Sequence, residues 1–195
     1  MVVEPDNLID RYIDAGCDIV IVHAEACLHL HRTLKYIADT GAVPGVALNP
    51  HTPPELINEV KDLLGLALVM TVNPGFGGQK YISSMEPKIK RVAEILDGLD
   101  CDIEVDGGIG VETASGAVQA GANVLVSGSA LYKDPKGLEN AVKELRTKFE
   151  IICKSLCSKI KSINQTLTNI ETNVLMSCDL LQVCPPHYGI PATIL

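Results

Sequence analysis

The sequence lacks any apolar run long enough to cross a membrane. Its longest apolar run, residues 66–72, is interrupted by Thr71, whereas a membrane-spanning helix needs about 20 residues. The chain also opens without the basic segment and apolar core of a signal peptide. We therefore expect a protein with no membrane partner and a cytoplasmic location, with a plastid as the alternative.

Positive charge is scarce as well. The 195 residues include 16 Lys and Arg against 24 Asp and Glu, so the formal net charge is −8. Nucleic acids attract basic proteins, and this balance argues against nucleic acid as a partner. The net negative charge is still compatible with a local site in which backbone amides bind a small anion. Hydrophobic residues make up 47% of the chain, which is ordinary for a globular protein that buries a sizeable core.

The seven cysteines do not form a disulfide framework. Their odd number and the lack of a secretion signal favour reduced thiols. Four of them, Cys153, Cys157, Cys178 and Cys184, lie after residue 150. Neither close pair has the two-residue spacing typical of zinc ligands, so we interpret all four as free thiols, with a zinc site as the alternative.

The composition changes near residue 150 and suggests two segments. Residues 1–150 hold 15 of the 16 glycines and 22 of the 24 acidic residues. Residues 151–195 hold three Lys, two acidic residues and a Pro-Pro pair. We expect residues 1–150 to form the folded domain. Residues 151–195 would be a C-terminal tail of unknown role, either one amphipathic helix or disordered.

Strands and helices alternate in the first segment. Five short runs rich in Val and Ile are each followed by a helical period, and near-continuous apolar character predicts strands buried on both faces. The runs are residues 18–22, 43–48, 66–72, 102–105 and 123–126. Strict alternation predicts a parallel sheet, either doubly wound or part of a (β/α)₈ barrel. Residues 52–55 (TPPE) and 83–86 (SSME) are typical of helix capping boxes.

Glycine-rich turns follow three consecutive strands. Because function in parallel α/β folds lies at the carboxyl ends of the strands, these turns are candidates for a shared site. Glycines let backbone N–H groups approach an anion closely, and residues 129–132 could add one helical turn. We predict a phosphate site here, and tight βα turns are the alternative. Its residues are Gly75, Phe76, Gly77, Gly78, Gly107, Gly108, Gly128 and Ser129.

Four other side chains end strands. Asp106 precedes a Gly-Gly turn and could be a general base or a metal ligand, or simply a helix N-cap or turn residue. His23 and Glu25 are two residues apart and share one strand face, where they line the site or have a structural role. Met70 on its own is typical of core packing.

Several stretches, in order, resemble ribulose-phosphate 3-epimerases. Residues 69–80 read VMTVNPGFGGQK, and the similarity extends over about residues 1–149. The other matching stretches are residues 18–25, 46–50, 103–109 and 120–130. The resemblance implies a (β/α)₈ barrel that interconverts D-ribulose 5-phosphate and D-xylulose 5-phosphate. It also implies that the glycine turns hold the phosphate.

The resemblance assigns chemistry to single residues as well. Asp106 resembles one of two acid/base aspartates and also a ligand of a divalent metal, which could be Zn, Fe, Mn or Co. Met70, and with it Met1, resembles the methionines that wall the reacting carbons and exclude water. Epimerisation needs a carboxylate on each face of the sugar and a positive partner for the enediolate. The family resemblance further implies a homo-oligomer.

The sequence departs from the family pattern at its beginning. The matching text begins just after the metal-binding His of the family's third strand, and the first and second strands, with the other acid/base Asp and further metal ligands, are absent. The five predicted strands therefore correspond to family strands 4 to 8. We therefore expect an incomplete barrel from a truncated epimerase that lacks half of the catalytic site. The alternatives are an allulose-6-phosphate 3-epimerase and a non-catalytic fragment that retains phosphate binding or subunit contacts.

Overall fold

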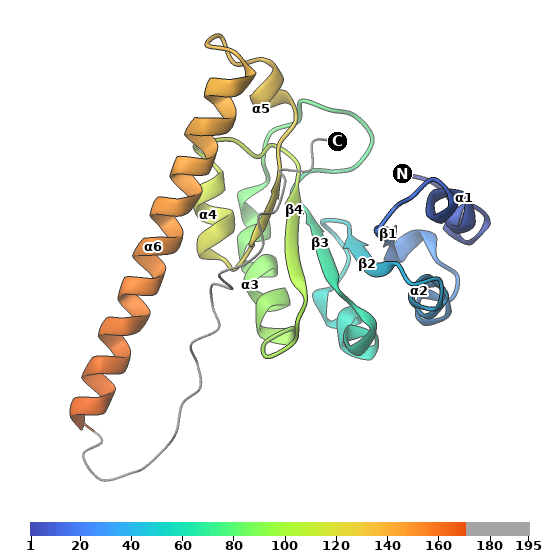
Figure 1. Cartoon of the computed structure of the whole chain (residues 1–195), viewed down its shortest axis with the longest axis horizontal. Coiled ribbons are helices and arrows are strands. Elements are labelled where there is room, and N and C mark those ends of the chain that lie inside the picture. Colours follow the sequence, from blue (N-terminus) through green and yellow to red (C-terminus); the bar gives the residue numbers. More distant parts are fainter. Residues whose placement is uncertain (171–195) are drawn as a thin grey trace.

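A computed structural model describes residues 1–170 of the chain. Its centre is a five-stranded sheet in the order β1-β2-β3-β4-β5, with every neighbouring pair parallel (Figure 1). The strands are β1 (Ile19–His23), β2 (Val43–Leu48), β3 (Leu66–Met70), β4 (Asp102–Asp106) and β5 (Val124–Val126). The five predicted strands are thus confirmed, with ends that differ by at most two residues.

Helices connect the strands. The α-helices are α1 (Ile9–Asp14), α2 (Leu30–Asp39), α3 (Glu86–Ile95), α4 (Ala114–Gln119), α5 (Ser129–Tyr132) and α6 (Leu138–Ile170). Short 3₁₀ helices are η1 (Pro5–Asn7), η2 (Ala24–Ala26), η3 (Pro54–Glu59), η4 (Lys61–Leu63) and η5 (Ser83–Met85). Neither capping box is formed: η3 follows Pro53 and α3 follows Met85, both without a side-chain cap.

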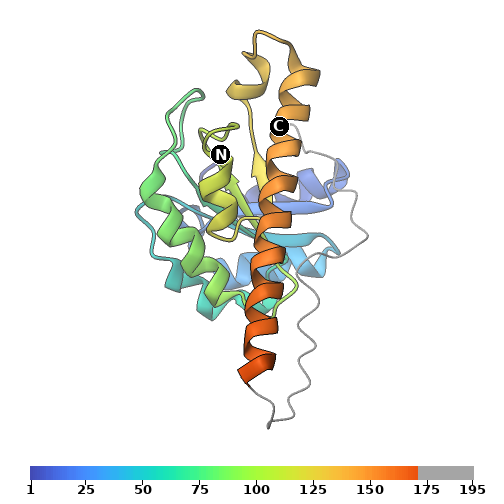
Figure 2. The ribbon, with the colours of Figure 1, turned by 90° about the vertical axis from the view of Figure 1, so that its left-hand side faces the viewer.

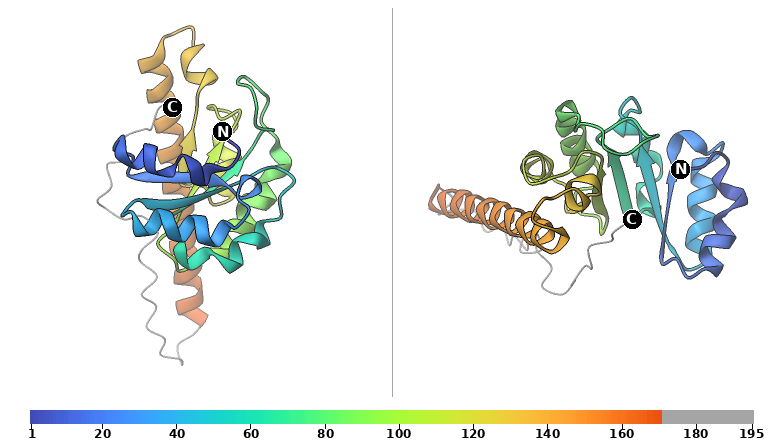
Figure 3. Two further views of the ribbon diagram at one scale, coloured as in Figure 1. Left: turned by 90° about the vertical axis from the view of Figure 1, so that its right-hand side faces the viewer. Right: turned by 90° about the horizontal axis from the view of Figure 1, so that it is seen from above.

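One face of the sheet carries the main core. Side chains that alternate along the strands, such as Val46, Val69 and Val105, pack there against α2 and α3. Leu34 of α2 and Ile89 of α3 are fully buried in this cluster. Seen from above, the helices flank the strands on that outer side (Figure 3). Burial of each such side chain stabilises the folded state by about 1.5–3 kcal/mol. This gain determines which side chains of each strand face the helices.

The opposite face, here called the open face, has a small core made of strand residues. Ala47, Leu66, Leu68 and Met70 are buried there together with Val72, which directly follows β3. At the β1 edge of the sheet the open face is not covered by other side chains, and Ile19 of β1 is 47% exposed. Within residues 1–170, β1 and β5 each pair with a single strand, so the sheet has two free edges.

Helix α6 runs through the predicted segment boundary. It begins at Leu138 and continues to Ile170 without a break at residue 150, and it packs against α4 and α5 (Figure 2). The division into a domain and a tail therefore stays a prediction. The side chains of Cys153 and Cys157 and all of residues 171–195 lie outside the described part. No helix in the described part is long and apolar enough to cross a membrane.

Candidate functional site

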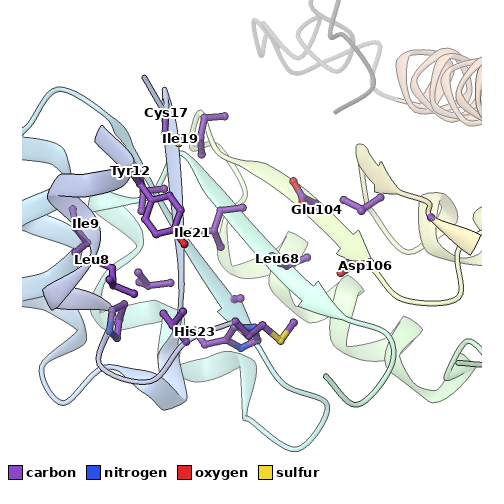
Figure 4. Close-up of a pocket in the computed structure, with 18 residues that line it drawn as sticks. Leu8, Ile9, Tyr12, Cys17, Ile19, Ile21, His23, Leu68, Glu104 and Asp106 are labelled. Atoms are coloured by element: carbon purple, nitrogen blue, oxygen red, sulfur yellow. The ribbon is translucent and has the colours of Figure 1, made fainter. Parts of the chain in front are cut away.

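The carboxyl ends of all five strands lie at one edge of the sheet because the strands are parallel. The loop between β3 and α3 and the short helix α5 lie at that edge (Figure 1). A cavity of about 400 Å³ opens on the open face between α1 and the strands (Figure 4). Its walls are mostly apolar side chains, and His23, Glu104 and Asp106 add ionisable groups.

Asp106 lies in this cavity as the last residue of β4. It is aligned with Met70 on β3 and Val126 on β5. The buried Thr71 fixes the turn, since its hydroxyl donates to the carbonyl oxygens of Asp106 at 2.9 Å and Gly107 at 2.6 Å. Partial burial raises the pKa of the Asp106 carboxyl. Thr113, not Asp106, occupies the N-cap position of α4, so Asp106 is not a helix N-cap, and a role as a turn residue stays the alternative.

Glu104 is a second carboxyl group on the same face, two residues before Asp106. Burial, followed by the charges of Asp106 and Asp102, raises its pKa to about 7. The sequence analysis did not single it out. The signal was the two-residue spacing, because alternate residues of a strand share a face.

Glu104 makes stability depend on pH in a direction that can be tested. Its pKa rises from 4.5 in the unfolded chain to about 7 in the folded one, so the folded state binds more protons between these values. Stability is therefore full below about pH 4.5 and falls as pH rises to about 7. We expect Glu104→Gln to remove about 2 kcal/mol of this loss, as measured by urea unfolding at pH 4.5 and pH 8. The control is Glu112→Gln at an exposed position, which leaves the pH dependence of stability unchanged. If Glu104→Gln lost as much stability between pH 4.5 and pH 8 as the unaltered chain, the prediction would be contradicted.

The three glycine-rich turns meet one another. A Cβ on Gly108 would lie 2.4 Å from the backbone nitrogen of Tyr81, so the turn after β4 touches the loop after β3. A Cβ on Gly110 would lie 3.3 Å from that of Ala130 in α5, and one on Gly78 would lie 3.8 Å from the Lys133 ammonium nitrogen. The three turns form one cluster, and Lys133 adds a positive charge that the sequence analysis missed.

Steric crowding alone accounts for two of these glycines. Gly107 has φ +120° and Gly108 has φ +67°, conformations that L side chains rarely adopt. Turn geometry therefore requires glycine at both positions, and their role in phosphate binding stays a prediction. Gly75, Gly77 and Gly128 have no neighbouring atom where a Cβ would lie, and Phe76 is 78% exposed.

Gly107→Ala is expected to destabilise the fold. The new methyl group would lie 2.4 Å from the nearest Val72 side-chain carbon at a left-handed φ, so the free energy of unfolding should fall by about 1–3 kcal/mol. Urea unfolding measures this loss. Gly77→Ala is the matched control, since its Cβ position is open, and we expect a change within about 0.5 kcal/mol. Equal stability of the two variants would contradict the steric argument.

The other predicted residues have separate surroundings. Met70 is 1% exposed in the small core of the open face, so its packing role holds, while Met1 lines the cavity. His23 also lines the cavity, and its Nδ1 lies 3.2 Å from a Glu25 carboxylate oxygen.

Comparison with known proteins identifies the family. The model of the ribulose-phosphate 3 epimerase family matches residues 1–132. The chain belongs to this family. It is 52% identical over 149 residues to the ribulose-phosphate 3-epimerase of Bacillus subtilis, covering 75% of this chain and 68% of the relative. It is 44% identical over 150 residues to the chloroplastic ribulose-5-phosphate-3-epimerase of Arabidopsis thaliana, covering 75% and 53%.

Solved structures agree on the fold. The 3-hexulose-6-phosphate synthase of Salmonella typhimurium aligns with a TM-score of 0.59 at 18% identity, over 76% of this chain and 69% of that one. Such neighbours are TIM-barrel-like enzymes, which favours the barrel over the doubly wound sheet. The chain spans roughly half to two thirds of the length of the curated epimerases it matches.

The metal implied by the epimerase resemblance does not fit the described residues alone. Asp106 is the one expected ligand present, and the side chains that the structure describes include no group of three or more His, Cys, Asp or Glu that could hold a metal ion. Divalent metals of this kind take four or more ligands. No step below is therefore assigned to a metal, and the roles of Asp106 as a ligand and of any metal stay predictions.

Proposed function

We propose that the chain supplies one half of a ribulose-phosphate 3-epimerase site, which interconverts D-ribulose 5-phosphate and D-xylulose 5-phosphate. The observation that carries this proposal is Asp106, which lies in the cavity beside the cluster of glycine turns in a member of the epimerase family. A carboxylate next to an anion site is the arrangement needed to move a proton on a phosphorylated sugar.

Asp106 is the proposed acid/base group. As a base, its carboxylate takes the proton from C3, and the electron pair moves toward the neighbouring carbonyl to give an enediolate. Burial raises the pKa of Asp106, and a higher pKa makes its carboxylate a stronger base. The apolar cavity wall limits access of water to the reacting carbon.

The turn cluster is the proposed phosphate site. Backbone N–H groups at Gly75, Gly77, Gly78, Gly107, Gly108, Gly128 and Ser129 provide neutral donors, and glycine leaves room for close approach. Lys133, beside Gly78, provides a positive charge for the dianion. Binding the phosphate far from C3 uses its binding energy to hold the sugar in place.

The five strands are proposed to be strands 4 to 8 of the family barrel. Two observations support this assignment: the sheet has free edges at β1 and β5 within the described residues, and the open face carries buried apolar residues such as Leu68. Epimerisation returns the proton on the opposite face of the sugar, so a second acid is required. The family resemblance places it on a strand that would pair beyond β1.

The test is turnover of ribulose 5-phosphate by the full chain with added divalent metal. Formation of xylulose 5-phosphate by the chain alone would reject a non-catalytic fragment and would contradict the need for a second acid from outside the chain. Faster turnover of allulose 6-phosphate would reassign the substrate. Exchange of the C3 proton with deuterated water, without epimerisation, is the result expected when Asp106 acts alone. The cytoplasmic location and a homo-oligomer stay predictions.

A further inference from the structure

His23 lines the same cavity as Asp106. Ile19, Ile21 and His23 alternate along β1 and share the open face. His23 is the last residue of the strand, and its imidazole projects into the cavity (Figure 4). Its side chain is 16% exposed. A polar ring at the carboxyl end of a strand, in a largely apolar cavity, is well placed to contact a ligand.

Glu25 holds this ring in place. One Glu25 carboxylate oxygen lies 3.2 Å from His23 Nδ1. The other accepts hydrogen bonds from the Asn49 backbone N–H at 2.9 Å and from the Thr52 hydroxyl. The Thr52 hydroxyl therefore donates to Glu25 and does not cap a helix, as the predicted capping box would require.

The surroundings keep Glu25 ionised. Burial opposes its charge, but hydrogen bonds from Thr52, Asn49 and His23 outweigh burial and lower its pKa. The Asn49 loop is itself anchored, because the buried Lys88 ammonium of α3 donates to the Asn49 carbonyl at 2.6 Å and the Pro50 carbonyl at 3.3 Å. An ionised carboxylate is acceptor-only, so in this contact His23 donates from Nδ1.

The contact with Glu25 leaves one ring nitrogen for a ligand. With Nδ1 donating to Glu25, Nε2 of the neutral imidazole is an acceptor. No hydrogen bond to Nε2 is found within the described part of the chain. The turn cluster follows strands β3, β4 and β5, whereas His23 ends β1 at the other side of the sheet. Ala47 of β2 is in register with His23, and Leu68 of β3 is in register with Ala47. A sugar phosphate anchored at the turns with C3 at Asp106 therefore extends its C1 end toward His23.

We propose that His23 is a positioning residue that accepts a hydrogen bond from the C1 hydroxyl of the ketose phosphate, with its ring oriented by Glu25. This inference rests on the proposed function. A hydrogen bond of this kind contributes about tenfold to affinity.

A pair of ligands isolates this hydrogen bond. Xylulose 5-phosphate has the C1 hydroxyl and 1-deoxyxylulose 5-phosphate lacks it. By calorimetry on the full chain, we expect the first to bind about tenfold more tightly. His23→Ala should reduce this ratio to below about twofold, and His23→Gln, which keeps a polar atom near the Nε2 position, should restore part of it. Binding of inorganic phosphate should not change in either variant.

Two further variants separate positioning from general damage. Thr52→Val removes a donor to Glu25 and should lower the ratio without changing phosphate binding. His31→Gln, on the exposed surface, should leave the ratio at its original value. An unchanged ratio in His23→Ala overturns the inference and leaves the proposed function standing. Failure of the unaltered chain to bind either sugar phosphate overturns both.

The ring itself provides a second measurement. Long-range proton–nitrogen NMR correlations of the full chain, assigned with His23→Gln, should show hydrogen on Nδ1 and not on Nε2. The Nε2 signal should shift on addition of xylulose 5-phosphate and stay unchanged with the 1-deoxy compound. Hydrogen on Nε2, or equal shifts with both ligands, would contradict the proposed contact.

Discussion

Joining the chain to the family's first three strands, taken from the Bacillus subtilis relative, is expected to raise its epimerase activity at least about 100-fold. Two physical reasons support this. The added strands would pair with the free edges at β1 and β5, which otherwise leave backbone groups unpaired. They would also bring the second acid, and one positioned acid/base group contributes about 10²- to 10⁴-fold to rate.

Turnover of ribulose 5-phosphate by the fused and the unfused chain measures this effect. The control is the same fusion with Gly107→Ala, which disturbs the turn after β4 while leaving every added residue in place. Equal activity of the fused and unfused chains would show that the five-stranded sheet needs no further strands for turnover.

Asp106→Asn in the fused protein is expected to lower epimerisation by about 10²- to 10⁴-fold. The amide keeps the shape of the side chain but cannot take the C3 proton. The carbonyl oxygens that Thr71 anchors belong to the backbone, so the turn and phosphate binding should persist. We expect xylulose 5-phosphate to bind within about threefold of its original affinity.

Two measurements distinguish loss of chemistry from loss of binding. Exchange of the C3 proton in deuterated water reports proton removal, and calorimetry reports binding. Glu104→Gln is the matched control, because it changes a neighbouring carboxyl group on the same strand face. Unchanged exchange in Asp106→Asn would remove Asp106 from the mechanism.

The strands could be predicted from the sequence because their signal is local. Residues 66–70 are apolar throughout, and all five residues of β3 are buried, as expected for a strand covered on both faces. The position of Asp106 at the end of β4, with Gly107 directly after it, also followed from order along the chain. The capping boxes failed because a local motif competes with tertiary partners: Thr52 donates to Glu25, a residue 27 positions earlier.

The sequence by itself determined the parallel α/β plan, the family and the edge at which the functional residues lie, since hydrophobic period and motif are properties of the order of residues. Only the tertiary structure decided which groups share an environment. Glu104 has a raised pKa because the strand turns it into a partly buried space beside Asp106. Lys133 lies near Gly78, and His23 lines the same cavity as Asp106, because the chain returns to the same edge after each helix. Distances between residues far apart in sequence depend on packing, and no local pattern encodes them.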